Sequence, residues 1–105
     1  MRVISRNGFL IGMRDTGDQQ HYLGLKVSEQ PTDSVTFIQY NPKEKKVDPS
    51  IDEVFLAESV KIGIKKYNAD KGTALAVTEI KYVPYDLPNY DVYTIMTEAI
   101  LSKGL

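Results

Sequence analysis

The second half of the chain combines two hydrophobic periods. Apolar residues recur every three or four positions over 51–67 and again over 92–100, which predicts two amphipathic helices. Between them, residues 73–83 alternate with a period of two, as a strand does. The main apolar stripe of the first helix consists of Leu56, Val60, Gly63, Ile64 and Tyr67. That of the second consists of Val92, Ile95, Met96, Ala99 and Ile100.

The first half predicts strands. Residues 21–27 and 34–40 each alternate and are bounded by polar turn residues. Residues 2–14 are rich in β-favouring side chains but contain Asn7-Gly8, which signals either a tight hairpin or a bulge in one long strand. We favour one long, interrupted strand, because each half is short. The predicted order is β-β-β-α-β-α, an α+β two-layer sandwich with a four-stranded sheet and two helices on one face.

The first helix has alternative start signals and a second apolar stripe. Either Asp48 or Ser50 can cap its amino end. The second stripe, Ile51, Phe55 and Ile62, lies roughly 100–140° from the first at about 100° per residue. It can pack against the second helix or form an interface with a partner. Asn89 is the expected cap of the second helix.

Composition limits the class of protein more than its chemistry. The 105 residues suit one domain, 1–105, and carry 13 basic and 14 acidic side chains, a net charge of -1. That balance gives no general attraction to nucleic acid or to an anionic membrane. The chain has no cysteine and no apolar run approaching the roughly 18 residues that span a bilayer. We expect a cytoplasmic protein with no membrane partner.

No reactive constellation is recognisable. His21 is the only histidine, whereas metal sites usually need three or four ligands, so we expect no metal and no cofactor. Asp86 and Asp91 are the one candidate carboxylate pair, but we expect them in a solvated loop and a helix first turn, where they would not differ in pKa as acid–base catalysis requires. We therefore do not expect an enzyme.

Tyrosines and lysines offer candidate binding groups. Tyr82, Tyr85, Tyr90 and Tyr93 cluster around residues 84–89, where their rings can stack on unpaired bases, anchor a protein interface or fill the margin of the core. Six lysines form either a local basic patch or a solvated polar face: Lys43, Lys45, Lys46, Lys61, Lys65 and Lys66.

Several segments resemble the fourth domain of elongation factor G. In that family a strand leads into a glycine-rich loop with glutamine and histidine, and a second strand follows, as over 9–27 here. Residues 58–64 are similar to the family's helix, 78–82 to its last strand and 89–92 to its second loop. The resemblance extends over residues 8–101. The chain departs from the family in its first loop, which carries Asp15 and Asp18 instead of an arginine between glycines, and at Tyr90, where the family has a histidine.

The resemblance implies a left-handed β-α-β crossover and two loops that share one tip. Its tip would bring together eight residues, Gly17, Gln19, Gln20, His21, Tyr85, Asp86, Asn89 and Tyr90. It further implies a non-catalytic module associated with the ribosome or with RNA through that tip. The alternative is a protein-interaction or self-associating domain that uses Ile51, Phe55 and Ile62.

Overall fold

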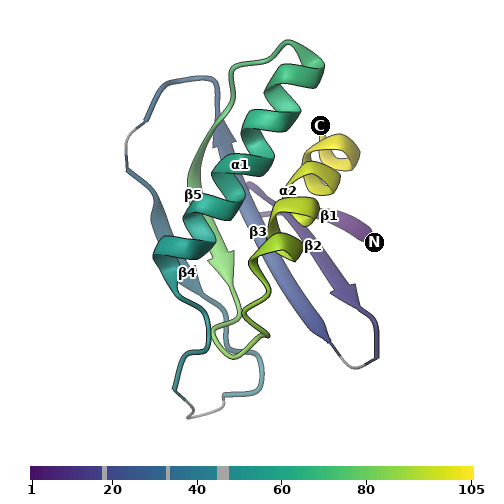
Figure 1. Ribbon diagram of the computed structural model, residues 1–105, viewed down its shortest axis with the longest axis vertical. Helices are drawn as coiled ribbons and strands as arrows, with labels where there is room; N and C mark the ends of the chain where they lie inside the picture. Colours follow the sequence, from purple (N-terminus) through teal and green to yellow (C-terminus); the bar gives the residue numbers. More distant parts are fainter. Residues whose placement is uncertain (18, 33, 45–47) are drawn as a thin grey trace.

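Five strands form one mixed sheet, and both helices lie on the same side of it (Figure 1). This computed structural model describes residues 1–17, 19–32, 34–44 and 48–105. The elements are β1 (Arg2–Arg6), β2 (Phe9–Asp15), β3 (Gln20–Ser28), β4 (Thr36–Gln39), α1 (Glu53–Lys71), β5 (Ala76–Tyr82) and α2 (Tyr90–Gly104). The α+β class and the two predicted helices are confirmed, while the number of strands differs from the four predicted.

The additional strand arises at Asn7-Gly8. These residues have φ values of 52° and 83°, and Arg6 pairs with Phe9 across them. Two consecutive residues with positive φ are what a type I′ hairpin turn requires, and its twist matches that of the flanking strands. The prediction of one long, interrupted strand is therefore wrong, because the turn creates the separate strands β1 and β2.

The sheet order is β1-β2-β3-β5-β4. Its neighbouring strands are antiparallel except for β4 and β5, which are parallel. A parallel pair needs a crossover connection, and α1 supplies it. In Figure 1 the chain runs down β4 at the left edge, up α1 in front of the sheet, and down β5 to the right of β4.

The helices begin and end at defined capping residues. Asp52, rather than Asp48 or Ser50, caps α1: its carboxylate accepts hydrogen bonds from the backbone N–H of Val54 at 2.8 Å and of Phe55 at 3.2 Å. Gly72 ends α1 in the left-handed conformation that favours glycine. Asn89 is the N-cap residue of α2, as predicted, although its side chain makes no capping hydrogen bond.

The two helices pack closely through Gly63. A Cβ atom at this position would lie 2.7 Å from the Cβ of Thr97 and 2.8 Å from the backbone oxygen of Thr94. Only glycine fits this approach without a shift of α2. The predicted stripe of α1 faces the main core, which also takes side chains from the sheet, including Leu23, Leu25, Ile80 and Tyr82. In the predicted stripe of α2, Val92, Met96 and Ile100 face this core, but including Ile95 is wrong, because it is 62% exposed.

The sheet has a second apolar cluster on its other face. Successive strand residues point to opposite faces, so Tyr22 lies opposite its neighbour Leu23. Tyr22, Phe9, Ile11 and Val83 are each no more than 9% exposed and pack together. We call this side, which neither helix covers, the open face. Within the described ranges, neither helix is long and apolar enough to cross a bilayer.

Candidate functional site

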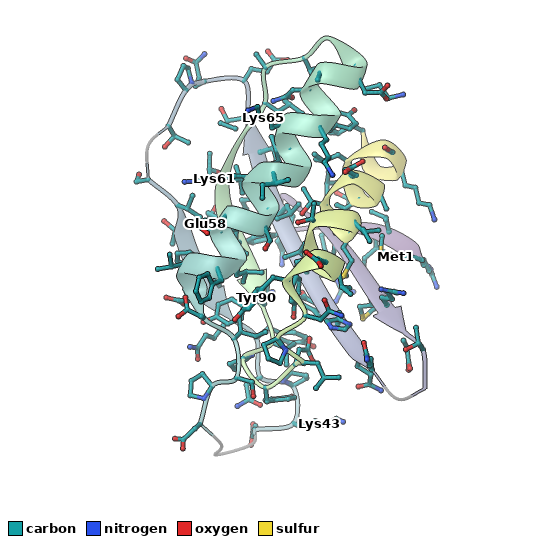
Figure 2. The ribbon with its side chains drawn as sticks, in the orientation of Figure 1. Met1, Lys43, Glu58, Lys61, Lys65 and Tyr90 are labelled. Carbon is teal, nitrogen blue, oxygen red and sulfur yellow. The ribbon has the colours of Figure 1, made fainter. Side chains whose placement is uncertain are left out.

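A pocket of about 280 Å³ lies where the β2–β3 loop, the β5–α2 loop and the segment after β4 meet. We call it the tip pocket. It lies at the lower end of the molecule in Figure 2, where Lys43 is labelled. Side chains from several parts of the chain line it, among them Arg14, Gln20, His21, Tyr22, Tyr40, Lys43, Tyr85 and Asp86.

Asp86 is the buried carboxylate of the tip pocket. It is 9% exposed, and its Oδ2 accepts a hydrogen bond from the backbone N–H of Tyr22 at 2.9 Å. Burial raises the pKa of Asp86 to about 6, although the Tyr22 N–H and the charge of Lys43 both lower it. The expectation that Asp86 sits in a solvated loop is wrong, because the turn after β5 folds its side chain back under β3. Asp91 is exposed in the first turn of α2, as predicted.

His21 lies on β3, is buried, and lines the same pocket as Asp86. Only 2% of its surface is exposed, and its ring meets Tyr93 edge-on, with centroids 5.4 Å apart. Within the described residues neither ring nitrogen makes a hydrogen bond of normal geometry. Burial lowers the pKa of His21, the nearby Leu87 carbonyl raises it, and the charge of Arg14 lowers it further. The ring is therefore neutral at pH 7.

Tyr93, whose ring contacts His21, is a further buried polar side chain next to the tip pocket. Its side chain is fully buried, and its hydroxyl has no hydrogen-bond partner among the described residues. Burial raises the pKa of Tyr93, and the nearby Asp86 and Tyr90 raise it further. Unpartnered buried polar atoms cost about 1–3 kcal/mol each. The tip therefore holds hydrogen-bonding capacity that the fold itself does not use.

Aromatic rings and lysines continue from the pocket onto the open face. The rings of Tyr22 and Tyr40 lie 4.9 Å apart between centroids. Lys81 Nζ lies 5.1 Å from the Tyr40 ring and 5.5 Å from the Phe9 ring, and Lys26 Nζ lies 4.6 Å from the Phe9 ring. Lys26 also pairs with Glu79 at 3.1 Å. Sequence reasoning missed this surface, although the alternation over 21–27 already separates Tyr22 and Lys26 from the core leucines.

Four of the eight predicted tip residues line the pocket: Gln20, His21, Tyr85 and Asp86. Gly17 and Gln19 are exposed in the neighbouring turn, where the Gly17 N–H donates to Asp15 Oδ1 at 2.8 Å. Asn89 is exposed at the start of α2.

Tyr90 does not belong to the tip pocket. Its hydroxyl accepts a hydrogen bond from the Asp52 N–H at 2.9 Å, and its ring lies 5.5 Å from that of Phe55. Figure 2 places Tyr90 between the starts of the two helices, well above Lys43. Grouping Tyr90 with the residues that line the pocket is therefore wrong, since Tyr90 connects α2 to α1.

The predicted interface stripe is only partly exposed. Phe55 and Ile62 lie on α1 and are 54% and 51% exposed. Ile51 precedes the helix and is only 5% exposed, because it packs into the main core. Assigning Ile51 to an exposed stripe is therefore wrong.

Comparisons with family models, with curated proteins and with solved structures each find no significant similarity to this chain. Across residues 1–17, 19–32, 34–44 and 48–105, no three histidine or carboxylate side chains lie close enough together to hold a metal ion. The chemistry of the site rests on its own residues: aromatic rings, exposed cations and buried hydrogen-bonding groups.

Proposed function

We propose that this protein is a non-catalytic module that binds single-stranded RNA, as the resemblance to the fourth domain of elongation factor G implies, with ribosomal RNA as the natural target. The observation that carries the proposal is the exposed ring of Tyr40, which lines the tip pocket and lies 5.1 Å from Lys81 Nζ on the open face. Aromatic rings on a sheet are a recurring platform for unpaired bases, and lysines beside them attract the phosphates.

The geometry of this surface supports stacking. Tyr40 is 38% exposed at the edge of the sheet, so a base can reach its ring. Tyr22 lies beneath it and holds it in place. Lys81 lies within reach of Tyr40, where its charge can serve the ring and a nearby phosphate together.

The path of the chain through β4, α1 and β5 supports the resemblance. The chain descends β4, returns in front of the sheet and descends β5 to its right (Figure 1), a path that we interpret as the left-handed crossover implied by the resemblance. About 98% of such crossovers are right-handed, so this path is unusual.

Binding of a fluorescent single-stranded RNA, followed by anisotropy, tests the proposal. We expect the affinity to fall with salt, because phosphate contacts release counterions. We expect Tyr40→Ala to weaken binding roughly 10-fold, within the about 1–3 kcal/mol assigned to one base stacked on an aromatic ring. Lys81→Ala should also weaken binding and reduce the salt dependence.

Lys61→Ala is the matched control. Lys61 is an exposed lysine on α1, on the helical side of the sheet (Figure 2), and its loss should leave the affinity unchanged. If Lys61→Ala and Lys81→Ala lower the RNA affinity equally, the interaction is general charge attraction and not binding at the proposed surface. Absence of RNA binding at low salt, together with no protein travelling with ribosomal particles in a sedimented extract, would contradict the proposal.

Self-association through α1 is the second candidate. The exposed side chains of Val54, Phe55 and Ile62 support it, although the charged Glu58 interrupts the stripe between the last two. If α1 forms the interface, sedimentation at increasing concentration will show a dimer, and Phe55→Asp will abolish it. A protein that stays monomeric at high concentration would eliminate this candidate.

A further inference from the structure

We propose that the tip pocket takes the base of a single unpaired guanine nucleotide. This inference rests on the proposed RNA-binding function and names the base that the pocket prefers. It is carried by the placement of a buried carboxylate and an unpartnered buried histidine at the end of an aromatic, cationic surface.

The size of the pocket suits one base. Its volume of about 280 Å³ lies just under the roughly 300–1,000 Å³ of pockets that enclose drug-sized ligands. Tyr40, whose ring is exposed, lines one side and supplies a ring face against which a planar heterocycle can lie, while Tyr22 packs against it.

The carboxylate of Asp86 selects for hydrogen-bond donors. An ionised carboxylate only accepts, and its two oxygens offer about four sites. Oδ2 is held by the Tyr22 N–H at 2.9 Å, while Oδ1 accepts no hydrogen bond from the described residues. This fixed, buried group is matched best by a ligand that presents two donors side by side.

Guanine is the base with that pattern. Its Watson–Crick edge carries the N1–H and the N2 amino group next to each other, whereas the same edge of adenine, cytosine or uracil carries one donor group beside acceptors. A carboxylate can therefore hold guanine through two hydrogen bonds and the other bases through one.

His21 completes the match. A neutral imidazole has one N–H donor and one acceptor nitrogen, and His21 lines the pocket with its ring nitrogens unpartnered among the described residues. Guanine O6, the acceptor beside N1–H, is the natural partner of the His21 N–H.

The rim of the pocket distinguishes a nucleotide from a cation. An acidic aromatic pocket can also hold a methylated ammonium group. Arg14 and Lys43, however, are exposed and line the same pocket, as does the exposed carboxylate of Asp15. The two cations can attract the phosphate of a nucleotide, so we take a nucleotide as the ligand.

The test compares labelled nine-residue RNAs of uridine with one central guanine, inosine or adenine. Inosine lacks the N2 amino group and keeps every other group of the guanine edge. We expect guanine to bind roughly 10-fold more tightly than adenine, the discrimination typical of a bidentate base contact, with inosine between them. Asp86→Asn should remove the preference for guanine over adenine, because asparagine replaces one acceptor by a donor.

Asp91→Asn is the control, since Asp91 is an exposed carboxylate near the start of α2, and the preference should persist in it. Thermal unfolding of each variant verifies that it folds. Equal affinity of the wild type for all three RNAs would overturn the guanine assignment and leave RNA binding intact, whereas binding of none of them would overturn the proposed function itself. Guanosine monophosphate binding as tightly as the guanine RNA would support the guanine site and identify a free nucleotide as its source.

Discussion

The two ends of the sheet differ in how their polar side chains are hydrogen-bonded. At the far end, where α1 turns into β5, the side chain of Asn68 donates to the Leu75 carbonyl at 2.9 Å and accepts from the Leu75 N–H at 3.0 Å and the Thr73 hydroxyl at 2.8 Å. At the tip, His21 and Tyr93 bury polar atoms that have no partner within the described residues.

The difference separates a hydrogen-bonded structural end from the end that we propose binds RNA. A folded protein normally satisfies its buried polar groups, because each unpartnered group costs about 1–3 kcal/mol. The Asn68 end follows this rule and closes α1 with Gly72 in the left-handed conformation. The tip does not follow this rule, because His21 lacks a partner among the described residues in a pocket lined by rings and cations. Ligand pockets of this kind are usually formed before the ligand binds.

The largest expected effect is on the free energy of unfolding, at the Asn68 end of the sheet. Asn68→Ala removes three hydrogen bonds and leaves the backbone groups of Leu75 without their partners. We expect the free energy of unfolding to fall by about 2–3 kcal/mol, measured by urea denaturation. RNA affinity, measured where the variant remains folded, should be unchanged, because Asn68 does not line the tip pocket.

Asn89→Ala provides the matched control. Asn89 is also an asparagine at a helix end, but it is exposed and its side chain makes no capping hydrogen bond. Its loss should cost about 0.5 kcal/mol or less. If Asn68→Ala and Asn89→Ala lower the free energy of unfolding equally, the hydrogen bonds of Asn68 do not distinguish its end of the sheet from the tip.

The sequence predicts the layers well because hydrophobic period determines them. The stripes of both helices and the strand over residues 76–82 were recognisable, since each must bury one face. The hairpin at Asn7-Gly8 was misjudged because the same dipeptide fits a turn and a bulge, and only pairing between β1 and β2 distinguishes them.

The site was harder to predict for a different reason. His21 and Asp86 were proposed as neighbours through the resemblance, but their burial depends on how the turn after β5 packs under β3, a contact between residues 64 positions apart. The open face is not predicted from the sequence for a simple reason. Tyr22 stands among leucines, and the sequence does not show which side of the sheet the helices cover. The resemblance alone assigns Tyr90 to the tip, whereas Tyr90 is the first residue of α2 and its hydroxyl accepts a hydrogen bond from the Asp52 N–H.

The smaller expected effect concerns the tip itself and depends on pH. Burial gives Asp86 a pKa of about 6 in the folded protein against an ordinary value of 3.8, so between these values the folded state binds more protons than the unfolded state. Stability therefore decreases as pH rises through this window and stays reduced above about pH 6. The groups that act on Asp86 are Tyr22 from β3, Lys43 after β4 and Tyr93 from α2.

Asp86→Asn isolates this contribution. A shift of about 2 pKa units corresponds to about 3 kcal/mol, but the new amide also buries an N–H group that costs about 1–2 kcal/mol when unpartnered. We expect the variant to be about 1 kcal/mol more stable than the wild type at pH 7, with this advantage lost by about pH 4. His21, whose lowered pKa makes the protein less stable as pH falls below 6.5, acts equally on both proteins, so the difference between their urea curves reports Asp86 alone. A variant less stable than the wild type at pH 7 would mean that Asp86 is a structural group like Asn68, and the contrast between the two ends would fail.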